Sequence, residues 1–188
     1  MIRNDIGFIG VGNMGQAVMT SLLSAGDIDK SQIHAFNRTP GKLKKVAQSL
    51  SIQECASNDQ LIDKCSVIIL AVKPQDLVEL LETVGNQIRP DHFVISLAAG
   101  IRIQDLRRLM PQGPSLARVM PNTPVSIRRG VVGYVLAENS TGREAELRRL
   151  LNPLGVLVRV EEGEELDAFT VATSSGVTCF QTNDRSSG

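Results

Sequence analysis

The feature that most constrains this chain is a glycine-rich turn, GVGNMG, which directly follows the apolar run at residues 6–9. A helical pattern of apolar side chains begins after the turn and ends at Gly26, and a second apolar run lies at residues 33–36. A strand, a tight turn and a helix in this order form the first part of a βαβ unit. The sequence therefore predicts a parallel sheet with the glycine turn at the carboxyl end of its first strand.

The same alternation continues along the chain. Further strands are predicted at residues 67–72, 93–97, 116–120, 131–136 and 156–160. Helical patterns are predicted at residues 41–50, after Pro74, and at residues 103–110 and 143–154. Strands that alternate with helices and are apolar on both faces are typical of a doubly wound α/β domain with a mostly parallel sheet of Rossmann type. We expect this domain to span residues 1–162.

The pattern changes from residue 163 onward. The segment EELDAFTVAT at residues 164–173 predicts the opening of a helix, but a polar tail, CFQTNDRSSG, follows soon after it. A single helix offers Phe169, Val171 and Phe180 no core beyond that of the first domain. We therefore interpret residues 163–188 as the start of a truncated helical domain with a divergent tail, as a spliced or frameshifted product would have.

Charge and composition exclude several classes of protein. The 20 Lys and Arg residues balance 20 Asp and Glu residues, so a generally basic nucleic-acid binder is not expected. No apolar run approaches the roughly 18 residues of a membrane helix, so we expect a soluble, cytoplasmic protein. The cysteines Cys55, Cys65 and Cys179 form no CxxC pair and His34 lies far from His92 in the sequence, so neither a disulfide scaffold nor a metal site is expected.

The three glycines of the turn have distinct predicted roles in binding a dinucleotide. Gly10 allows the tight turn, Gly12 lets the backbone approach a pyrophosphate, and Gly15 allows close packing of the helix. The free amides near Asn13 and Met14 then face the phosphates, assisted by the helix dipole.

The end of the second strand decides which dinucleotide is favoured. An NAD-specific site would offer Asp or Glu to the ribose hydroxyls, whereas this chain offers Asn37, Arg38 and Thr39. No acidic residue occurs from residue 31 to residue 53, while Arg38, Lys42, Lys44 and Lys45 are basic. We therefore expect NADP to be favoured over NAD, which stays possible, with Arg38 as the contact to the 2′-phosphate and Lys44 or Lys45 merely solvating the helix.

Three later motifs also follow predicted strands, where open α/β sheets bind ligands. They are AVKP (Ala71, Val72, Lys73, Pro74), SLAAG (with Ala98, Ala99, Gly100) and MPNTP (with Asn122 and Thr123). We expect the first two to line the ribose and nicotinamide and Asn122 or Thr123 to orient a carboxamide or substrate, although each motif alone fits an ordinary loop. No catalytic acid, base or nucleophile stands out, so the catalytic residues are unknown.

Together, GVGNMG, NRT, AVKPQ, SLAAGI and RVMPNTP resemble the N-terminal domain of pyrroline-5-carboxylate reductase over residues 5–175. The resemblance implies reduction of 1-pyrroline-5-carboxylate to proline by NADPH or NADH, the last step of proline biosynthesis. It also implies that Asn58 contacts the adenine or ribose and that the missing helical domain supplies the substrate pocket and the homo-oligomer interface. The residues that it implies as cofactor contacts are Gly10, Gly12, Asn13, Met14, Gly15, Asn37, Arg38, Thr39, Asn58, Ala71, Val72, Lys73, Pro74, Ala98, Ala99, Gly100 and Asn122.

Two other readings stay open at this point. One is a different reductase on the same cofactor domain, such as an F420-dependent NADP oxidoreductase or a β-hydroxyacid dehydrogenase, against which the joint occurrence of AVKPQ, AAGI and MPNTP argues. The other is a non-catalytic NADP-binding or regulatory subunit, for which the absence of the helical domain is the main support.

Overall fold

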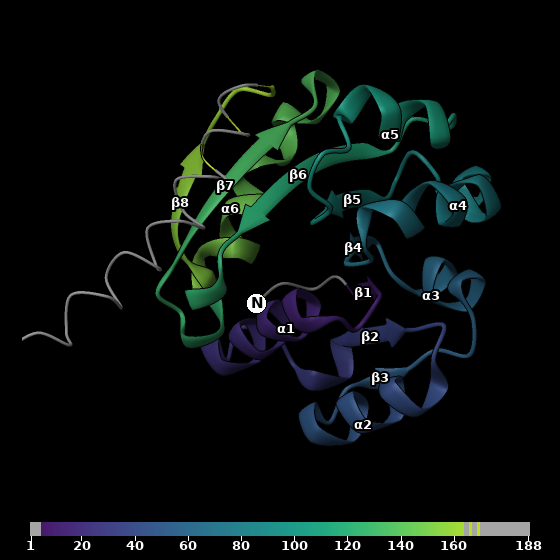
Figure 1. Ribbon diagram of the computed structural model, residues 1–188, viewed down its shortest axis with the longest axis vertical. Coiled ribbons are helices and arrows are strands. Elements are labelled where there is room, and N and C mark those ends of the chain that lie inside the picture. The colour runs from purple at the N-terminus through teal and green to yellow at the C-terminus, as the bar shows by residue number, and fades with distance from the viewer. Residues whose placement is uncertain (1–4, 164–165, 167–168, 170–188) are drawn as a thin grey trace, which may run out of the picture.

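The computed structural model describes residues 5–163 together with Leu166 and Phe169, and it forms an eight-stranded sheet flanked by helices (Figure 1). The strands are β1 (Ile6–Ile9), β2 (Ile33–Phe36), β3 (Gln53–Glu54), β4 (Val67–Leu70), β5 (Phe93–Ser96), β6 (Ser115–Pro121), β7 (Gly130–Leu136) and β8 (Gly155–Arg159). The α-helices are α1 (Asn13–Ala25), α2 (Pro40–Leu50), α3 (Asn58–Lys64), α4 (Pro74–Val84), α5 (Ile103–Leu109) and α6 (Glu144–Leu151). Short 3₁₀ turns are η1 (Lys30–Gln32), η2 (Gly85–Gln87), η3 (Thr123–Ile127), η4 (Glu138–Arg143) and η5 (Asn152–Leu154).

The strand order is β3-β2-β1-β4-β5-β6-β7-β8. Strands β1 to β6 run parallel, β7 runs antiparallel to β6, and β8 runs parallel to β7. The predicted doubly wound, mostly parallel α/β fold is therefore confirmed. Apolar side chains of α1, α2 and α6 pack on one face of the sheet and those of α3, α4 and α5 on the other, which explains why strands such as Val67–Leu70 are buried on both sides.

Several local predictions differ from the structure. The two-residue strand β3 and the seven-residue helix α3 were not predicted, because β3 is polar and exposed and α3 is too short to show a periodic apolar stripe. The helix predicted at residues 143–154 ends at Leu151, and Pro153 opens a 3₁₀ turn instead. The strand predicted at residues 67–72 ends at Leu70.

Two residues of the C-terminal segment are described, and both are helical and lie against the sheet. Leu166 is buried, and Phe169 packs beside Gly133 of β7, where a Cβ would lie 2.7 Å from the phenyl ring. The first domain thus does supply packing for Phe169. The rest of the predicted helix at residues 164–173, Val171, Phe180 and the divergent tail lie outside the described residues, so the domain boundary after residue 162 stays a prediction.

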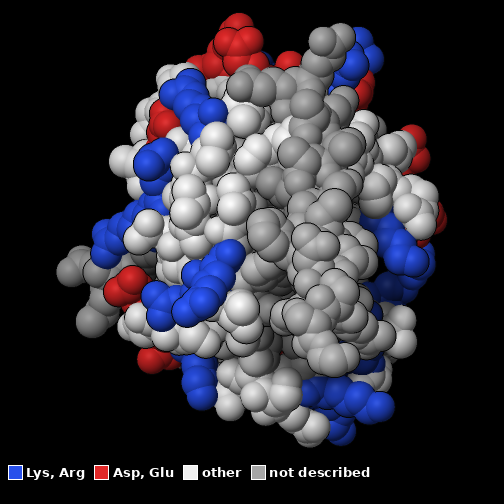
Figure 2. All heavy atoms as spheres, turned by 60° about the vertical axis from the view of Figure 1, so that its left-hand side comes forward, with Lys and Arg blue, Asp and Glu red and all other residues white. Residues whose placement is uncertain are grey.

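Two further features of the described residues are the lengths of their helices and the charges on their surface. None of the described helices is both long and apolar enough to cross a bilayer. Figure 2 shows lysine and arginine side chains on both sides of one face of the molecule, with fewer acidic groups among them.

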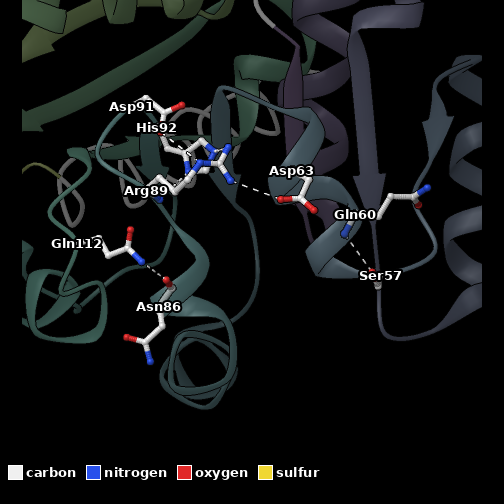
Figure 3. Close-up of polar contacts among 8 residues, drawn as sticks. All are labelled: Ser57, Gln60, Asp63, Asn86, Arg89, Asp91, His92 and Gln112. Carbon is white, nitrogen blue, oxygen red and sulfur yellow. Dashed lines mark hydrogen bonds and ion pairs between the residues drawn. The ribbon is translucent and has the colours of Figure 1, made fainter.

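A buried histidine joins the α3 and β5 regions (Figure 3). His92 is 1% exposed, and its Nδ1 accepts a hydrogen bond of 2.9 Å from the backbone N–H of Arg89. The Arg89 guanidinium lies 3.2 Å from Nε2 of the same ring and pairs with Asp63 and Asp91 at 3.5 and 3.4 Å. Burial, followed by the Arg89 charge, lowers the pKa of His92, although Asp91, the Ile62 carbonyl and Asp63 oppose the shift.

This arrangement predicts acid sensitivity. Because the folded-state pKa of His92 lies below its unfolded value of about 6.5, the unfolded chain binds the proton more tightly, and stability is lost as the pH falls below about 6.5. His34, whose pKa burial also lowers, contributes in the same direction. Urea unfolding at pH 7.5 and 5.5 should show this loss, and His92→Asn, which keeps an acceptor near Nδ1, should reduce it relative to wild type, as should His34→Asn. An unchanged pH slope in His92→Asn would contradict the assignment.

Candidate functional site

The sheet order places the sequence motifs side by side at one edge. Strands β2, β1, β4, β5 and β6 are neighbours and parallel, so their carboxyl ends lie along the same edge. The segments that follow these strands are Asn37–Thr39, the glycine turn, Ala71–Pro74, Ala98–Gly100 and Asn122. The motifs thus form a row in space, although their order along the sequence is different. Such an edge is where open α/β sheets bind ligands.

The glycines of the turn are required for different reasons. Gly10 has a φ of +101°, and a Cβ there would lie 2.7 Å from the Ala71 carbonyl oxygen. A Cβ at Gly15 would lie 3.0 Å from the Gly10 carbonyl oxygen and 3.1 Å from the Ala71 Cβ. The roles predicted for these two residues, a tight turn and close packing, agree with these contacts.

Gly12 differs from the other two because nothing in the described protein requires a glycine there. Its φ of −70° and ψ of 179° suit any residue, and a Cβ would meet only the Ala71 carbonyl oxygen at 3.8 Å. Gly12 is also the N-cap of α1, which has no side-chain cap and no acidic residue in its first turn. The N-terminal end of a 13-residue helix therefore lies beside open space that a side chain would fill.

Asn37 connects two of these loops. Its Oδ1 accepts a hydrogen bond of 3.3 Å from the N–H of Val11 in the glycine turn, and its Nδ2 donates to the Thr39 carbonyl at 3.2 Å. The Gly10 N–H also donates to the Phe36 carbonyl at 2.9 Å. The glycine turn is thus held against the end of β2, which sets the distance between α1 and Arg38.

A groove of about 570 Å³ opens between these loops and helix α4. Residues predicted from the sequence as cofactor contacts make up much of its lining: Gly10, Gly12, Asn37, Arg38, Thr39, Asn58, Ala71, Val72 and Lys73. The other predicted contacts do not line it: Asn13, Met14, Gly15, Pro74, Ala98, Ala99, Gly100 and Asn122. A second hollow of about 870 Å³ lies between α5, β7 and the chain after β8, away from the glycine turn.

The groove contains acidic residues that the sequence analysis did not consider. Arg38, Lys42 and Lys73 line it together with Asp76 and Glu79, which come from α4. The Arg38 Nη2 lies 3.7 Å from the Asp76 Oδ1. The preference expected for NADP was based on the absence of acidic residues at 31–53 and did not take Asp76 and Glu79 into account. The missed residues, Asp76 and Glu79, lie in the first two turns of α4, the helix that follows β4. The position of Asp76 in the first turn of a helix after a strand is the signal that could have identified it.

Two asparagines predicted as contacts have distinct surroundings. Asn58 lies in the first turn of α3, which the Ser57 hydroxyl caps by accepting from the Gln60 N–H at 3.1 Å (Figure 3). The Asn58 Oδ1 is shielded from solvent and has no hydrogen-bond partner among the described residues. The Asn122 Oδ1 accepts from the Val131 N–H at 3.0 Å and so links the end of β6 to the start of β7.

The segment after β5 has the small side chains expected for close approach of a ligand. Ala98 is 2% exposed, and its N–H donates to the Ser96 hydroxyl at 3.3 Å. Gly100 has a φ of +76°, a conformation that favours glycine. This segment forms a turn at the carboxyl edge of the sheet. Its contact with a cofactor stays a prediction.

Comparison with known proteins identifies the family. Residues 5–100, which include the glycine turn, AVKP and SLAAG, match the family described as "NADP oxidoreductase coenzyme F420-dependent". The chain belongs to this family. The matched residues run from the start of β1 through the turn after β5 and thus include most of the row of motifs at the carboxyl edge.

Relatives that align with nearly the whole chain are named pyrroline-5-carboxylate reductase, which confirms the resemblance expected from the motifs. The enzyme of that name from Pseudomonas aeruginosa is 30% identical over 176 residues, 93% of this chain and 64% of the relative. The chain spans 62% to 64% of the length of the first curated relatives that it matches.

Solved structures confirm the fold. A pyrroline-5-carboxylate reductase from Coxiella burnetii superposes with a TM-score of 0.86 at 25% identity, covering 95% of this chain and 67% of that one. The pyrroline carboxylate reductase of Plasmodium falciparum, solved with NADP bound, gives 0.85 at 22% identity over 97% of this chain and 66% of that one. Both likenesses support the Rossmann-like α/β fold described above for residues 5–163.

Proposed function

We propose that this chain binds NADP(H) along the carboxyl edge of its sheet and forms the cofactor-binding part of a pyrroline-5-carboxylate reductase. The observation that carries the proposal is Gly12, which leaves a space beside the uncapped N-terminus of α1 that no described residue needs. A pyrophosphate fits this space because its charge is complementary to the free amides and the helix dipole. The names of the relatives support the reaction.

The proposed contacts follow the order of the strands. Gly10, Gly12, Asn13, Met14 and Gly15 hold the pyrophosphate, and Asn37, Arg38 and Thr39 hold the adenosine ribose with its 2′-phosphate. Asn58 contacts the adenosine end. The segments that follow β4 and β5 line the nicotinamide ribose with Ala71–Pro74, Ala98, Ala99 and Gly100. Asn122 lies beside the nicotinamide. In this arrangement NADPH supplies the hydride, and the protein's residues orient the cofactor against the imine and exclude water.

The proposed reaction is the reduction of 1-pyrroline-5-carboxylate to proline, with NADPH preferred and NADH also accepted. Homo-oligomer formation and a cytoplasmic location remain predictions from the sequence and the resemblance. No catalytic side chain is assigned to the described residues.

Two measurements test the proposal. Isothermal titration of the chain should give saturable binding of NADPH, tighter than that of NADH, and NADPH oxidation should depend on added 1-pyrroline-5-carboxylate. Binding without turnover would support the cofactor site and reject the reaction for this chain. Absence of binding by either dinucleotide, in protein shown to be folded by circular dichroism, would reject the proposal as a whole.

A further inference from the structure

Asp76 places a carboxylate in the groove beside Arg38, the residue proposed to bind the 2′-phosphate of the cofactor. Asp76 lies in the first turn of α4, and its Oδ1 is 3.7 Å from the Nη2 of Arg38. Both residues line the groove, Arg38 from the segment between β2 and α2 and Asp76 from α4. The side chains are 38% and 81% exposed, so the pair itself adds little to folding stability.

From this placement, and resting on the proposed function, we infer that Asp76 sets the preference between the two nicotinamide cofactors by opposing the 2′-phosphate at Arg38. A 2′-phosphate that binds Arg38 brings negative charge close to the Asp76 carboxylate. The two anions repel each other and compete for the same guanidinium. NADH lacks this phosphate, so its affinity does not include the repulsion.

Other charged residues of the groove show why the effect is expected from Asp76 in particular. Lys42 and Lys73 add positive charge, whereas Glu79 lies one turn beyond Asp76 on α4 and adds a second carboxylate. Among the described contacts, Arg38 pairs with Asp76 and not with Glu79. Neutralising either acid changes the net charge of the groove equally, but only the change at Asp76 releases Arg38.

The decisive variant is Asp76→Asn, with Glu79→Gln as the charge-matched control. We expect Asp76→Asn to tighten NADPH binding about threefold to tenfold and to change NADH binding by less than about twofold. Glu79→Gln should also change the ratio of the Kd for NADH to the Kd for NADPH. The change in the logarithm of this ratio should be less than half of the change that Asp76→Asn produces. Isothermal titration of all three proteins at low salt measures these ratios, and thermal unfolding verifies that each is folded.

Two further measurements separate charge from structure. The advantage of Asp76→Asn for NADPH should shrink as NaCl rises from about 50 mM to 500 mM, since the affected charges are exposed to solvent. Asp76→Glu, which keeps a carboxylate, should give a ratio of NADH to NADPH Kd values close to that of wild type. In an Arg38→Ala background, the NADPH preference should fall, and Asp76→Asn should recover part of it by removing the repulsion.

The outcomes are distinguishable. Weaker NADPH binding in Asp76→Asn would show that Asp76 positions Arg38 for the phosphate, and this would overturn the inference. An unchanged ratio, with wild-type protein that binds NADPH, would overturn the inference and leave the proposed function intact. Failure of the wild type to bind either cofactor would overturn both.

Discussion

Gly12→Ala should abolish most cofactor binding while the protein stays folded. The added Cβ has ordinary backbone angles and meets only the Ala71 carbonyl oxygen at 3.8 Å, so the cost to folding is limited to the weaker N-cap, about 1 kcal/mol or less. The same methyl group occupies the space proposed for the pyrophosphate. Crowding of this kind costs about 1 to 3 kcal/mol, so the Kd for NADPH should rise about fivefold to 150-fold in isothermal titration.

Two glycine variants serve as controls for this experiment. Gly10→Ala places a Cβ at φ +101° and 2.7 Å from a backbone oxygen, so its main effect should be a lower Tm, by about 6 °C or more. Gly142→Ala, in η4, meets no heavy atom within 4 Å and should change neither Tm nor Kd appreciably. A Gly12→Ala protein that binds NADPH like wild type would show that the space is not used by the cofactor.

Glu162→Ala should produce the largest loss of stability among changes to charged side chains proposed here. The Glu162 Oε1 accepts from the Arg118 Nη1 at 2.7 Å and from the Ile103 N–H at 2.9 Å, and so joins the chain after β8 to β6 and to the start of α5. Arg118 is 3% exposed, and its Nε already lacks a partner among the described residues. Removing the carboxylate leaves a buried unpaired cation, which costs about 3 kcal/mol.

Urea unfolding measures this loss, and the chain offers a matched comparison. Arg108→Ala breaks the exposed pair with Asp105, whose side chains are 77% and 44% exposed, and should cost about 0.5 kcal/mol or less. Arg118→Met combined with Glu162→Gln removes both charges and should recover most of the stability lost in Glu162→Ala. Equal losses for Glu162→Ala and Arg108→Ala would mean that the buried guanidinium is solvated in another way.

Much of the fold could be predicted because its signals are local. The strands Ile6–Ile9 and Ile33–Phe36 have the predicted bounds, since each is a short apolar run bounded by turn residues. The antiparallel direction of β7 was not predicted. Between Pro121 and Gly130 the chain forms only the 3₁₀ turn η3, which is too short for a crossover between parallel strands. The alternation of strands and helices in the rest of the sequence favours parallel strands, so this short connection was not interpreted as a change of direction.

The candidate site, like the fold, could be predicted only in part. Gly10, Arg38 and Lys73 could be placed in one groove because each follows a strand, and the carboxyl ends of parallel strands meet. Asp76 and Glu79 could not be weighed against Arg38, because they are far from it in the sequence and only the pairing of β1 with β2 and β4 brings them together. The inferred effect on cofactor preference therefore depends on a contact that the composition near Arg38 does not reveal.

The position of the motifs on five adjacent strands has a consequence for how this protein can change. Arg38 follows β2 and Asn122 follows β6, so four strand spacings, about 19 Å, separate the two ends of the row. Substitutions that far apart, with no shared partner among the described residues, should contribute nearly independently to the free energy of folding. We therefore expect that residues at the proposed phosphate-binding end can be exchanged with little effect on the structure of the proposed nicotinamide end, so that protein engineers can vary the two ends separately.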